Sequence, residues 1–438
     1  MPVASYNSGF ETTNRTELVA FRAAEASNYL RIGSRKYLGK EQLQGKRNGV
    51  DYEFVIRDAG VYQEGLDLTN GVTDTYSGNV GKGASKLQER KVKKSIKLGN
   101  VVIGTNFLNK ITDVNWDDEI AKPQGKKLIN GVVASAVDAD LGLQNTAFVG
   151  AGFQPLFKGQ NFLKTISDET AYGFINPMIN SILSSNGQSF NPAEASDVFS
   201  KAGLVGALAD VTYRSNQYMP MVSVDSDLDT EMKKVTGIAY ADAGDGINAT
   251  LTLSGVGAKI PKGYVLWIKG IYATDLVGDK TSALKAFIAY DDSDSNGVMK
   301  IRKVNFKGEG TKEICTKTGA AIYSAADSHE YDAFNTLVEH YTAANLDLLP
   351  VGDYFGGFIR VQGAMEFETL DELDASNADT KTETVEGLTV IENRAVNTMA
   401  GTNDTRWTVA SISGIIEPRE VTYCLVRDKV VNQVFVNQ

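Results

Sequence analysis

The sequence is poor in the residue types on which most catalytic and metal sites depend. Its 438 residues include only two histidines, His329 and His340, and two cysteines, Cys315 and Cys424. Two histidines give little material for a Ser-His-Asp triad or for a metal site built on imidazoles. The cysteines lie far apart and lack CxxC spacing, so we expect neither a disulfide framework nor a zinc site.

Long apolar runs and a secretory signal are also missing. No uninterrupted apolar stretch approaches the roughly 20 residues that a helix needs to cross a bilayer. The first fifteen residues, MPVASYNSGFETTNR, have neither the charged start nor the apolar core of a signal peptide. We therefore expect a protein that is made and used in a reducing, aqueous compartment.

An excess of basic charge is absent too. The chain has 44 Lys and Arg residues against 54 Asp and Glu residues, which gives a formal net charge of −10. Because nucleic-acid phosphates attract basic surfaces, this balance argues against a general affinity for nucleic acid. Hydrophobic residues make up 42% of the chain and charged residues 22%, which indicates a packed globular protein rather than a disordered one.

Three glycine-rich segments begin like a dinucleotide-binding GxGxxG motif but lack its last glycine. They are GKGASK (81–86), GDGINA (244–249) and GVGAKI (255–260). None follows a strand pattern and opens a helix pattern, as phosphate binding requires.

HEYDAF (329–334) lacks the second histidine of a metalloprotease helix, and the nucleophile pattern GxSxG does not occur. We therefore expect neither a cofactor nor a catalytic set.

The best metal candidate is DDSDSNG (291–297). Asp292, Asp294 and Asn296 match the first ligand positions of a calcium loop. Counted from Asp292, the ninth and twelfth positions hold Lys300 and Lys303 instead of ligands. These two cations favour a solvated hairpin turn between two strands, with calcium binding as the alternative.

The strongest charge feature is a basic run over 82–97. Proteins that bind single-stranded nucleic acid usually have aromatic side chains between the basic ones, on which the bases stack. This run contains no aromatic residue. An acidic segment occurs later in the chain, so we expect charge pairing between subunits or domains, with a solvated face as the alternative. The basic residues are Lys82, Lys86, Arg90, Lys91, Lys93, Lys94 and Lys97, and the acidic ones are Glu368, Asp371, Glu372 and Asp374.

Apolar periodicity predicts an arm, a hairpin and helices in the first half of the chain. Residues 16–38 have the pattern of an amphipathic helix with Thr16 as its N-cap. Two extended segments on either side of a glycine-rich tip predict a long hairpin. Residues 126–141 have the broad apolar face of a helix, although Gly131 should cost it about 1 kcal/mol. Further helices are expected over 168–183 and 193–208.

After about residue 226 the pattern changes to short strands separated by Gly, Asp and Asn turns. Regular strands without intervening helices predict a compact β-barrel or sandwich of roughly a hundred residues. Within it, GAKIPKGYVLWIKGI (257–271) alternates, with Tyr264, Leu266 and Ile268 on one face and Val265, Trp267 and Lys269 on the other. The last hundred residues are strand-rich again, so the chain as a whole is predicted to be α+β.

One short stretch, VYQEGLDLTNG (61–71), resembles the long loop of major capsid (coat) proteins from short-tailed bacteriophages. The shared pattern is Gln-Glu-Gly, one apolar residue, then Asp-Leu-Thr, with Leu66 here in place of a Trp found in relatives. The order of the expected elements also resembles the Johnson fold of tailed-phage capsids over nearly the whole chain. The matching residues are Gln63, Glu64, Gly65, Asp67, Leu68 and Thr69.

This resemblance implies six consecutive parts. KPQGKK (122–127) interrupts the expected spine helix, so we expect that helix to be short or to begin at Pro123. Neither the lysine nor the asparagine of the crosslink found in some capsids can be matched here. The implied parts are an N-terminal arm (1–58), an E-loop hairpin (59–112), the spine helix of the P-domain (113–150), an A-domain/P-domain segment (151–226), an inserted β-barrel-like domain (227–330), and A-domain and P-domain strands (331–438).

The resemblance further implies a structural protein without enzymatic activity. Its copies would assemble as hexamers and pentamers into an icosahedral phage head around double-stranded DNA, made in the host cytoplasm and located in the virion. Gln63, Glu64 and Asp67 would join the charged residues at the subunit interface. Scaffolding, portal and decoration proteins are the implied partners, with no membrane and no sequence-specific nucleic acid. The alternatives are a phage tail or baseplate protein and a calcium-binding, β-rich surface protein.

Overall fold

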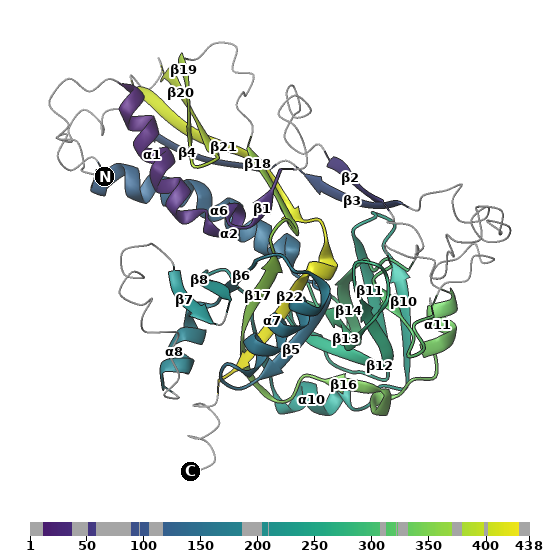
Figure 1. Cartoon of the computed structure of the whole chain (residues 1–438). Helices are drawn as coiled ribbons and strands as arrows, with labels where there is room; N and C mark the ends of the chain where they lie inside the picture. Colours follow the sequence, from purple (N-terminus) through teal and green to yellow (C-terminus); the bar gives the residue numbers. More distant parts are fainter. Residues whose placement is uncertain are drawn as a thin grey trace, which may run out of the picture.

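The computed structural model describes most of the chain and confirms that it is an α+β protein. In Figure 1, a long helix with its sheet occupies the upper left, a second sheet the centre, and a β-rich region the lower right. The described residues are 12–36, 51–57, 89–95, 97–104, 117–185, 204–208, 210–306, 312–320, 322, 332–369, 379–397 and 402–428.

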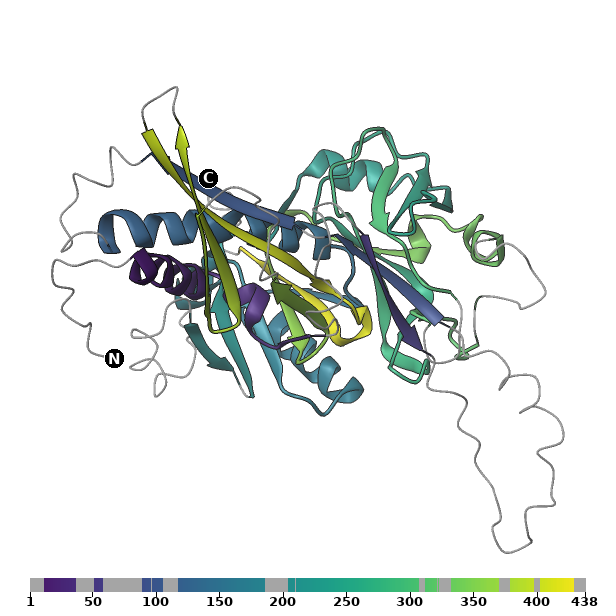
Figure 2. The ribbon, with the colours of Figure 1, turned by 90° about the horizontal axis from the view of Figure 1, so that it is seen from above.

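Two helices lie side by side at one end of the molecule, α1 (Thr12–Ala26) and α6 (Lys122–Asp140), as Figures 1 and 2 show. A π-helical turn, η2 (Asp117–Ala121), leads directly into α6. The helix expected over 126–141 is confirmed, and it begins at Lys122, one residue before the start expected at Pro123. Pro123 lies in the first turn of α6, where the backbone N–H that proline lacks has no helical partner to lose.

Gly125 lets α1 and α6 approach closely. A Cβ atom at this position would lie 2.8 Å from Cβ of Arg22 and 2.9 Å from the backbone oxygen of Val19. Gly131, six residues along the same helix, is exposed and would place a Cβ in open space. The first glycine therefore has a packing role that the second lacks.

The N-terminal helical segment differs from the expectation of one helix over 16–38. The helix α1 ends at Ala26, and a single turn, α2 (Asn28–Arg31), and a short strand, β1 (Ser34–Arg35), follow it. Thr16 is not an N-cap, because it lies inside α1 and is buried. Its hydroxyl donates a hydrogen bond to the carboxylate of Glu392 on a strand far along the chain. A tertiary contact therefore decides the role of this threonine.

A six-stranded sheet packs against α6, and its longest strand, β21 (Thr402–Ile415), organises it. This strand pairs antiparallel with three others. These are β4 (Lys97–Gly104), β18 (Met365–Thr369) and β20 (Leu388–Asn397), and the sheet is completed by β1 beside β18 and by β19 (Asp379–Val385) beside β20.

A seven-stranded mixed sheet forms the centre of the molecule. Its strand β17 (Gly352–Val361) is buried over most of its length. On one edge it pairs with β22 (Val421–Arg427), and a 3-10 turn, η4 (Pro418–Glu420), joins β22 to β21. The other strands are β5 (Thr146–Gly150), β6 (Ala171–Ile175), β7 (Leu204–Leu208), β8 (Val211–Ser215) and β9 (Met221–Val224).

The helices around this sheet correct two expectations. The helix α7 (Gln154–Ile166), which packs on β5, β17 and β22, lies in a segment for which no helix was expected. The helix expected over 168–183 is wrong in its first half, where β6 forms, and right only from α8 (Pro177–Ser185). The helix expected over 193–208 is wrong for its last five residues, which form β7, and its other residues lie outside the described chain.

The chain leaves the central sheet after Val224 and returns to it at Gly352, and these two residues are paired neighbours on β9 and β17. The residues between them, 225–351, form what we call the β-rich module. One of its sheets contains β10 (Gly237–Asp242), β11 (Asn248–Ser254) and β14 (Val298–Arg302). The other contains β12 (Val265–Thr274), β13 (Lys280–Ile288), β15 (Ile314–Cys315) and β16 (Leu346–Leu348).

The module extends beyond the boundary expected at residue 330. Leu346 to Leu348 of β16 pair with β12, and a 3-10 turn, η3 (Ala343–Asn345), precedes them. The module also contains α10 (Ser226–Met232) and α11 (Asp332–Val338). Phe334 of α11 is fully buried, and its ring centroid lies 5.6 Å from that of Phe306. Residues after 330 therefore supply part of the module's own core.

The alternation expected for 257–271 is confirmed on one face. Tyr264, Leu266 and Ile268 are fully buried, and Lys269 is exposed. Val265 is buried as well, so the other face of β12 is also covered at this position. Gly263 has φ +83°, so the Pro-Lys-Gly turn before this strand needs its glycine.

Gly125→Ala and Gly131→Ala should have opposite effects on stability. The first change forces α1 away from α6 and should lower the free energy of unfolding by about 1–3 kcal/mol. The second removes a flexible glycine from an exposed helix position and should raise it by about 0.5–1 kcal/mol. Denaturant unfolding of the two variants measures both values. Equal effects would contradict the packing role of Gly125.

A fragment comprising residues 225–351 should fold cooperatively by itself, whereas 227–330 should not. The shorter fragment lacks β16 and Phe334, which leaves an edge of β12 unpaired and opens the aromatic cluster. Circular dichroism with thermal melting distinguishes the two. A cooperative transition in the shorter fragment would show that the added residues are dispensable.

Candidate functional site

The candidate interface predicted from the sequence lies on a two-stranded hairpin, formed by β2 (Asp51–Arg57) and β3 (Glu89–Ser95). The strands pair antiparallel from Asp51↔Ser95 to Arg57↔Glu89. Among the described residues no third strand joins this sheet. The hairpin expected from the sequence is thus confirmed, but its first strand lies within 1–58, which had been assigned to the arm.

The predicted basic interface residues that the structure describes lie on the second strand of this hairpin and at the start of the strand that follows it. Arg90, Lys91, Lys93 and Lys94 lie on β3, and the register places Lys93 opposite Glu53. Lys97 begins β4, the strand that joins the six-stranded sheet directly after the hairpin. Four further interface candidates, Gln63, Glu64, Asp67 and Lys86, lie outside the described residues.

The acidic counterpart needs one correction. Glu368 lies on β18 with a side chain that is 1% exposed, and the ammonium of Lys36 lies 2.9 Å from its carboxylate. It therefore binds the N-terminal segment of its own chain and is not part of an exposed acidic surface. Asp371, Glu372 and Asp374 lie outside the described residues.

The candidate calcium loop, residues 291–297, forms a turn between β13 and β14, and a lysine side chain lies where a calcium ion would be expected. The ammonium of Lys300 lies 3.1 Å from the carboxylate of Asp291 and 3.0 Å from that of Asp294. Asp292 accepts a hydrogen bond from the backbone N–H of Lys262 at 2.8 Å, and Asn296 is exposed. Within the described parts of the chain, no group of three His, Cys, Asp or Glu side chains could hold a metal ion. This geometry favours the plain turn.

The two cysteines are free and buried among the described residues. Burial raises the pKa of both thiols, so neither is activated as a nucleophile.

Within the described residues, no helix is long and apolar enough to cross a membrane.

Two cations fasten the β-rich module to the C-terminal end of α6. Lys262, in the Pro-Lys-Gly turn, lies 2.7 Å from the carboxylate of Asp138. Arg302 donates to the backbone oxygens of Asp138 and Leu141 at 3.0 and 3.2 Å. Free carbonyl groups make a helix C-terminus partially negative, so cations there are stabilising. The turn before β12 thus has an anchoring role.

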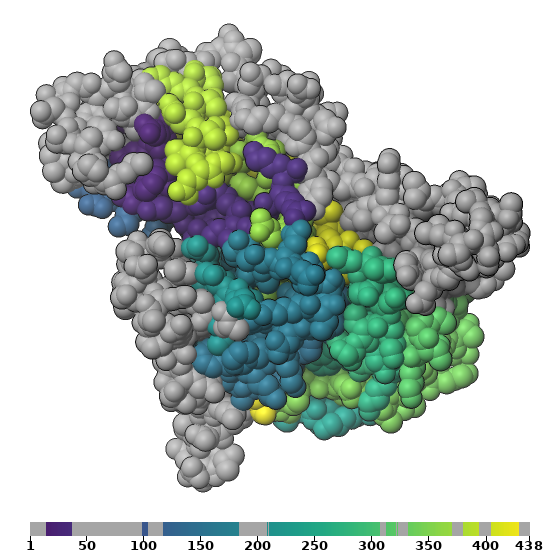
Figure 3. All heavy atoms as spheres, viewed as in Figure 1, coloured from purple at the N-terminus to yellow at the C-terminus, as the bar shows by residue number. Residues whose placement is uncertain are grey.

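A buried polar network joins the N-terminal segment to both sheets. Arg360 on β17 is 1% exposed, and its guanidinium carbon lies 4.9 Å from the ring centroid of Tyr29 and 4.6 Å from that of Phe174. It donates to the backbone oxygens of Tyr29 and Ile32. Burial lowers the pKa of Arg360. In Figure 3 the N-terminal segment lies between the strands drawn in lime and the α7 region drawn in blue.

The network continues into α6 through Asp140. The hydroxyl of Tyr29 donates to one carboxylate oxygen of Asp140 at 2.8 Å, and the backbone N–H of Ile415 on β21 donates to the other at 2.8 Å. Burial and the neighbouring Asp140 raise the pKa of Tyr29, which therefore stays a neutral donor. Sequence reasoning missed this network, because partners more than a hundred residues apart leave no local pattern.

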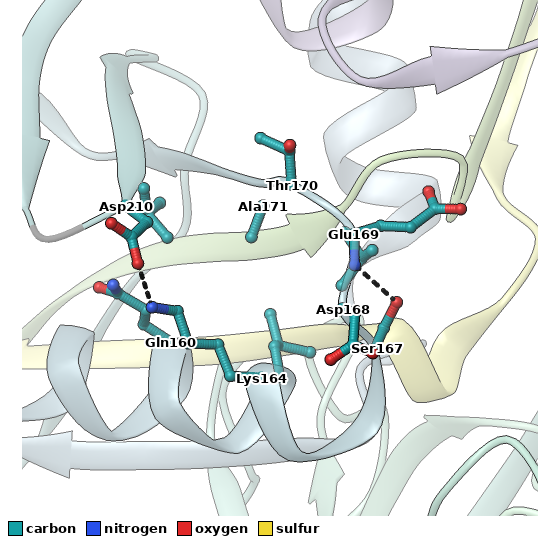
Figure 4. A pocket seen from close by; sticks show the side chains of 11 residues that line it. Gln160, Lys164, Ser167, Asp168, Glu169, Thr170, Ala171 and Asp210 are labelled. Atoms are coloured by element: carbon teal, nitrogen blue, oxygen red, sulfur yellow. Dashed lines mark hydrogen bonds and ion pairs between the residues drawn. The ribbon is translucent and has the colours of Figure 1, made fainter.

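A surface pocket of about 460 Å³ opens where α7 ends and β6 and β8 begin (Figure 4). Lys164 of α7 forms an ion pair with Asp210, the residue before β8. Glu169 is held by Arg35, whose guanidinium lies 2.6 Å from its carboxylate. Gln160 and Asp168 line the pocket together with Ser167, Thr170 and an apolar floor of Leu163, Ala171, Val211 and Val361.

Glu420, in η4, forms a hydrogen bond with Ser167, one of the residues that line this pocket. Burial, together with the nearby carboxylates of Glu417 and Glu169, raises its pKa to about 7. The hydrogen bond from Ser167 and the charge of Arg35 oppose this rise. Glu417 is itself paired with Arg419 at 2.8 Å. The surroundings of Glu420 therefore disfavour its charged form.

Glu420→Gln should stabilise the protein at alkaline pH. A carboxyl group with a raised pKa contributes stability below its unfolded pKa and loses it as the pH rises through about 7. At pH 8 the variant should therefore exceed the wild type in free energy of unfolding by roughly 1–2 kcal/mol after solvent screening, and the difference should vanish near pH 5. Urea unfolding from pH 5 to 8 measures this, with the exposed Glu119→Gln as a control. A difference independent of pH would contradict the assignment.

Comparison with known proteins gives matches among solved structures only: no protein-family model and no curated protein matches the sequence. The capsid of Ralstonia phage GP4 is similar at 6% identity, over 87% of this chain and 85% of that chain, with a TM-score of 0.39. The capsid structure of cyanophage P-SCSP1u is similar at 10% identity, over 88% and 85%, with a TM-score of 0.36. A virus-like particle from Pyrococcus furiosus is similar at 8% identity, over 95% and 100%, with a TM-score of 0.35.

Proposed function

We propose that the chain is a structural major capsid protein of a short-tailed bacteriophage. The observation that carries this proposal is the hairpin of β2 and β3, a two-stranded sheet that no other described strand joins. An isolated two-stranded hairpin is marginally stable in water, and a third strand or a packed face is needed to hold it. A second copy of the chain supplies that missing surface.

The charge of the hairpin supports an intermolecular role. Its second strand has the sequence ERKVKKS, with four basic residues among seven, whereas the whole chain has a net charge of −10. A basic strand on an acidic protein is attracted to other copies of that protein, and this attraction sets the orientation of docking. Many identical contacts of this kind close a shell by symmetry.

We further propose an assignment of the elements of the fold to the parts that the resemblance implies. We assign α1, α2 and β1 to the N-terminal arm, the hairpin of β2 and β3 to the E-loop, and α6 to the spine helix. The six-stranded sheet is then the P-domain, the seven-stranded sheet is the A-domain, and the β-rich module is the inserted domain. In this assignment the arm packs against the spine helix at Gly125. The inserted domain binds the C-terminal end of the same helix through Lys262 and Arg302.

The assembled form is a closed icosahedral head. Copies of the chain form its hexamers and pentamers and enclose the double-stranded DNA genome, with no enzymatic step. Scaffolding and portal proteins are the expected partners during assembly in the host cytoplasm, and the mature location is the virion.

Reversing three charges on the hairpin, as Lys91→Glu, Lys93→Glu and Lys94→Glu together, should block assembly without unfolding the subunit. These residues lie on β3, which pairs only with β2 among the described strands, so the change leaves the strands of the larger sheets unaltered. We expect particle yield to fall by at least about tenfold, since weakening a contact by roughly 1.4 kcal/mol already lowers one association constant tenfold and every subunit repeats that contact. Negative-stain electron microscopy of the pelletable fraction, with the chain expressed alone and with its upstream neighbour gene, measures the yield.

The matched control reverses three exposed lysines elsewhere, Lys158, Lys259 and Lys317, and so makes the same change in net charge. It should leave the yield of closed shells unchanged. Equal yields from the wild type and the hairpin variant would remove the hairpin from the interface. Rings or tubes from the wild type would indicate a tail or baseplate protein, and a small soluble species in every preparation would reject assembly.

A further inference from the structure

The sheet of β10, β11 and β14 has two outer strands, and their edges are protected in different ways. At β14 the backbone N–H of Tyr290 donates to the backbone oxygen of Lys300 at 3.0 Å, and the strand carries the charged side chains of Lys300 and Arg302. The exposed side chains of β10 are instead two alanines, Ala239 and Ala241. An edge strand without charged side chains is a template for pairing with another chain. The edge of β10 therefore needs protection from outside the strand.

The backbone of Tyr240, in the middle of β10, is bound by a side chain of α11. Asn335 accepts a hydrogen bond from the backbone N–H of Tyr240 at 2.6 Å and donates one to its backbone oxygen at 3.0 Å. Both backbone groups of Tyr240 therefore point away from β11, as at every second residue of an antiparallel pair. A side-chain amide offers the same donor and acceptor as a peptide group. Asn335 thus takes the place of a residue on a neighbouring strand.

The chain that follows α11 covers the beginning of the same edge. A Cβ atom at Gly237, the first residue of β10, would lie 3.0 Å from the backbone oxygen of Glu339. The backbone N–H of Ala343 donates to the backbone oxygen of Val235 at 3.1 Å. Figure 1 shows α11 beside β10. The helix and the turn after it therefore follow the edge from the middle of β10 to the residues that precede it.

The apolar side of α11 fixes the position of this cover. Phe334 and Val338 are fully buried, and the ring centroid of Phe334 lies 6.0 Å from that of Tyr240. Asn335 is the next residue after Phe334, so burial of this ring places the amide against the backbone of β10. The aromatic contact and the two hydrogen bonds act on the same residue of the strand.

From these contacts we propose that Asn335 and α11 guard the edge of β10 against antiparallel pairing with β10 of a second copy of the chain. A two-fold axis would bring two identical strands together, so that each outward donor meets an outward acceptor. The small side chains of Ala239 and Ala241 would not obstruct this approach. The inference is independent of the capsid proposal, because it concerns the folded state of a single chain and an edge far from the hairpin in sequence.

The variant Asn335→Leu tests the guard in the full chain, because leucine has the branched shape of asparagine without its polar atoms. At low protein concentration, hydrogen exchange of peptides that contain Tyr240 should be at least about tenfold faster than in the wild type, since its amide loses its acceptor. Sedimentation of the unassembled protein, after particles have been pelleted, should show dimers. We expect self-association at least about tenfold tighter than that of the wild type.

Further variants assign the association to the edge of β10. Adding Ala239→Lys to Asn335→Leu should restore the monomer, because lysine on an edge strand opposes pairing. Thr336→Ala is the matched control, since this exposed residue binds the backbone oxygen of Asp332 within α11. It should change neither exchange nor association. Asn335→Ala removes the same polar atoms with a smaller side chain, so it keeps the test informative if the leucine variant fails to fold.

Three results would overturn the proposal. Unchanged exchange at Tyr240 in both Asn335 variants would mean that the amide does not hold the edge. Faster exchange without self-association would mean that the contact only stabilises the module. Association that Ala239→Lys fails to reverse, or that Thr336→Ala also causes, would arise elsewhere on the protein. Since the unassembled protein is measured, none of these results depends on whether the chain forms shells.

Discussion

The structure depends on a guanidinium held in its interior. Arg360 is buried between the rings of Tyr29 and Phe174 and binds the backbone of the N-terminal segment. A buried charge is costly unless hydrogen bonds and aromatic faces compensate it, so the segment around Tyr29 has one favourable position. Tyr29 in turn fixes Asp140 at the end of α6, and Asp140 fixes β21. The N-terminal segment, the long helix and both sheets therefore hold one another in place.

The end of α6 is where these constraints meet. Asp140 faces the N-terminal segment and the six-stranded sheet, while Asp138 and the terminal carbonyl groups bind Lys262 and Arg302 of the β-rich module. Asp138 and Asp140 lie within one turn of α6. Because a packed interior transmits displacements rather than absorbing them, a shift of the β-rich module at Asp138 also displaces Asp140 and the polar network that it joins. The other regions of the protein are therefore positioned relative to one another by α6.

The sequence predicted the elements that local pattern determines. The hairpin, the helix over 126–141 and the buried face of 257–271 follow from periodicity and turn residues, and all three were found. The pattern failed where tertiary contacts decide the structure. Thr16 became a buried donor to Glu392, β6 formed where a helix was expected, and Glu368 paired with Lys36. The pocket could not be foreseen, since its lining comes from the ends of α7, β8 and β17, which only the fold brings together.

The pairing of Val224 with Gly352 has an evolutionary consequence. Because the chain leaves and rejoins the central sheet at neighbouring residues, a short turn could connect β9 directly to β17 and leave that sheet intact. The module can therefore change in length or sequence while β9 and β17 keep their register, provided that the cations at the end of α6 are retained. Its surface can diversify independently of the central sheet.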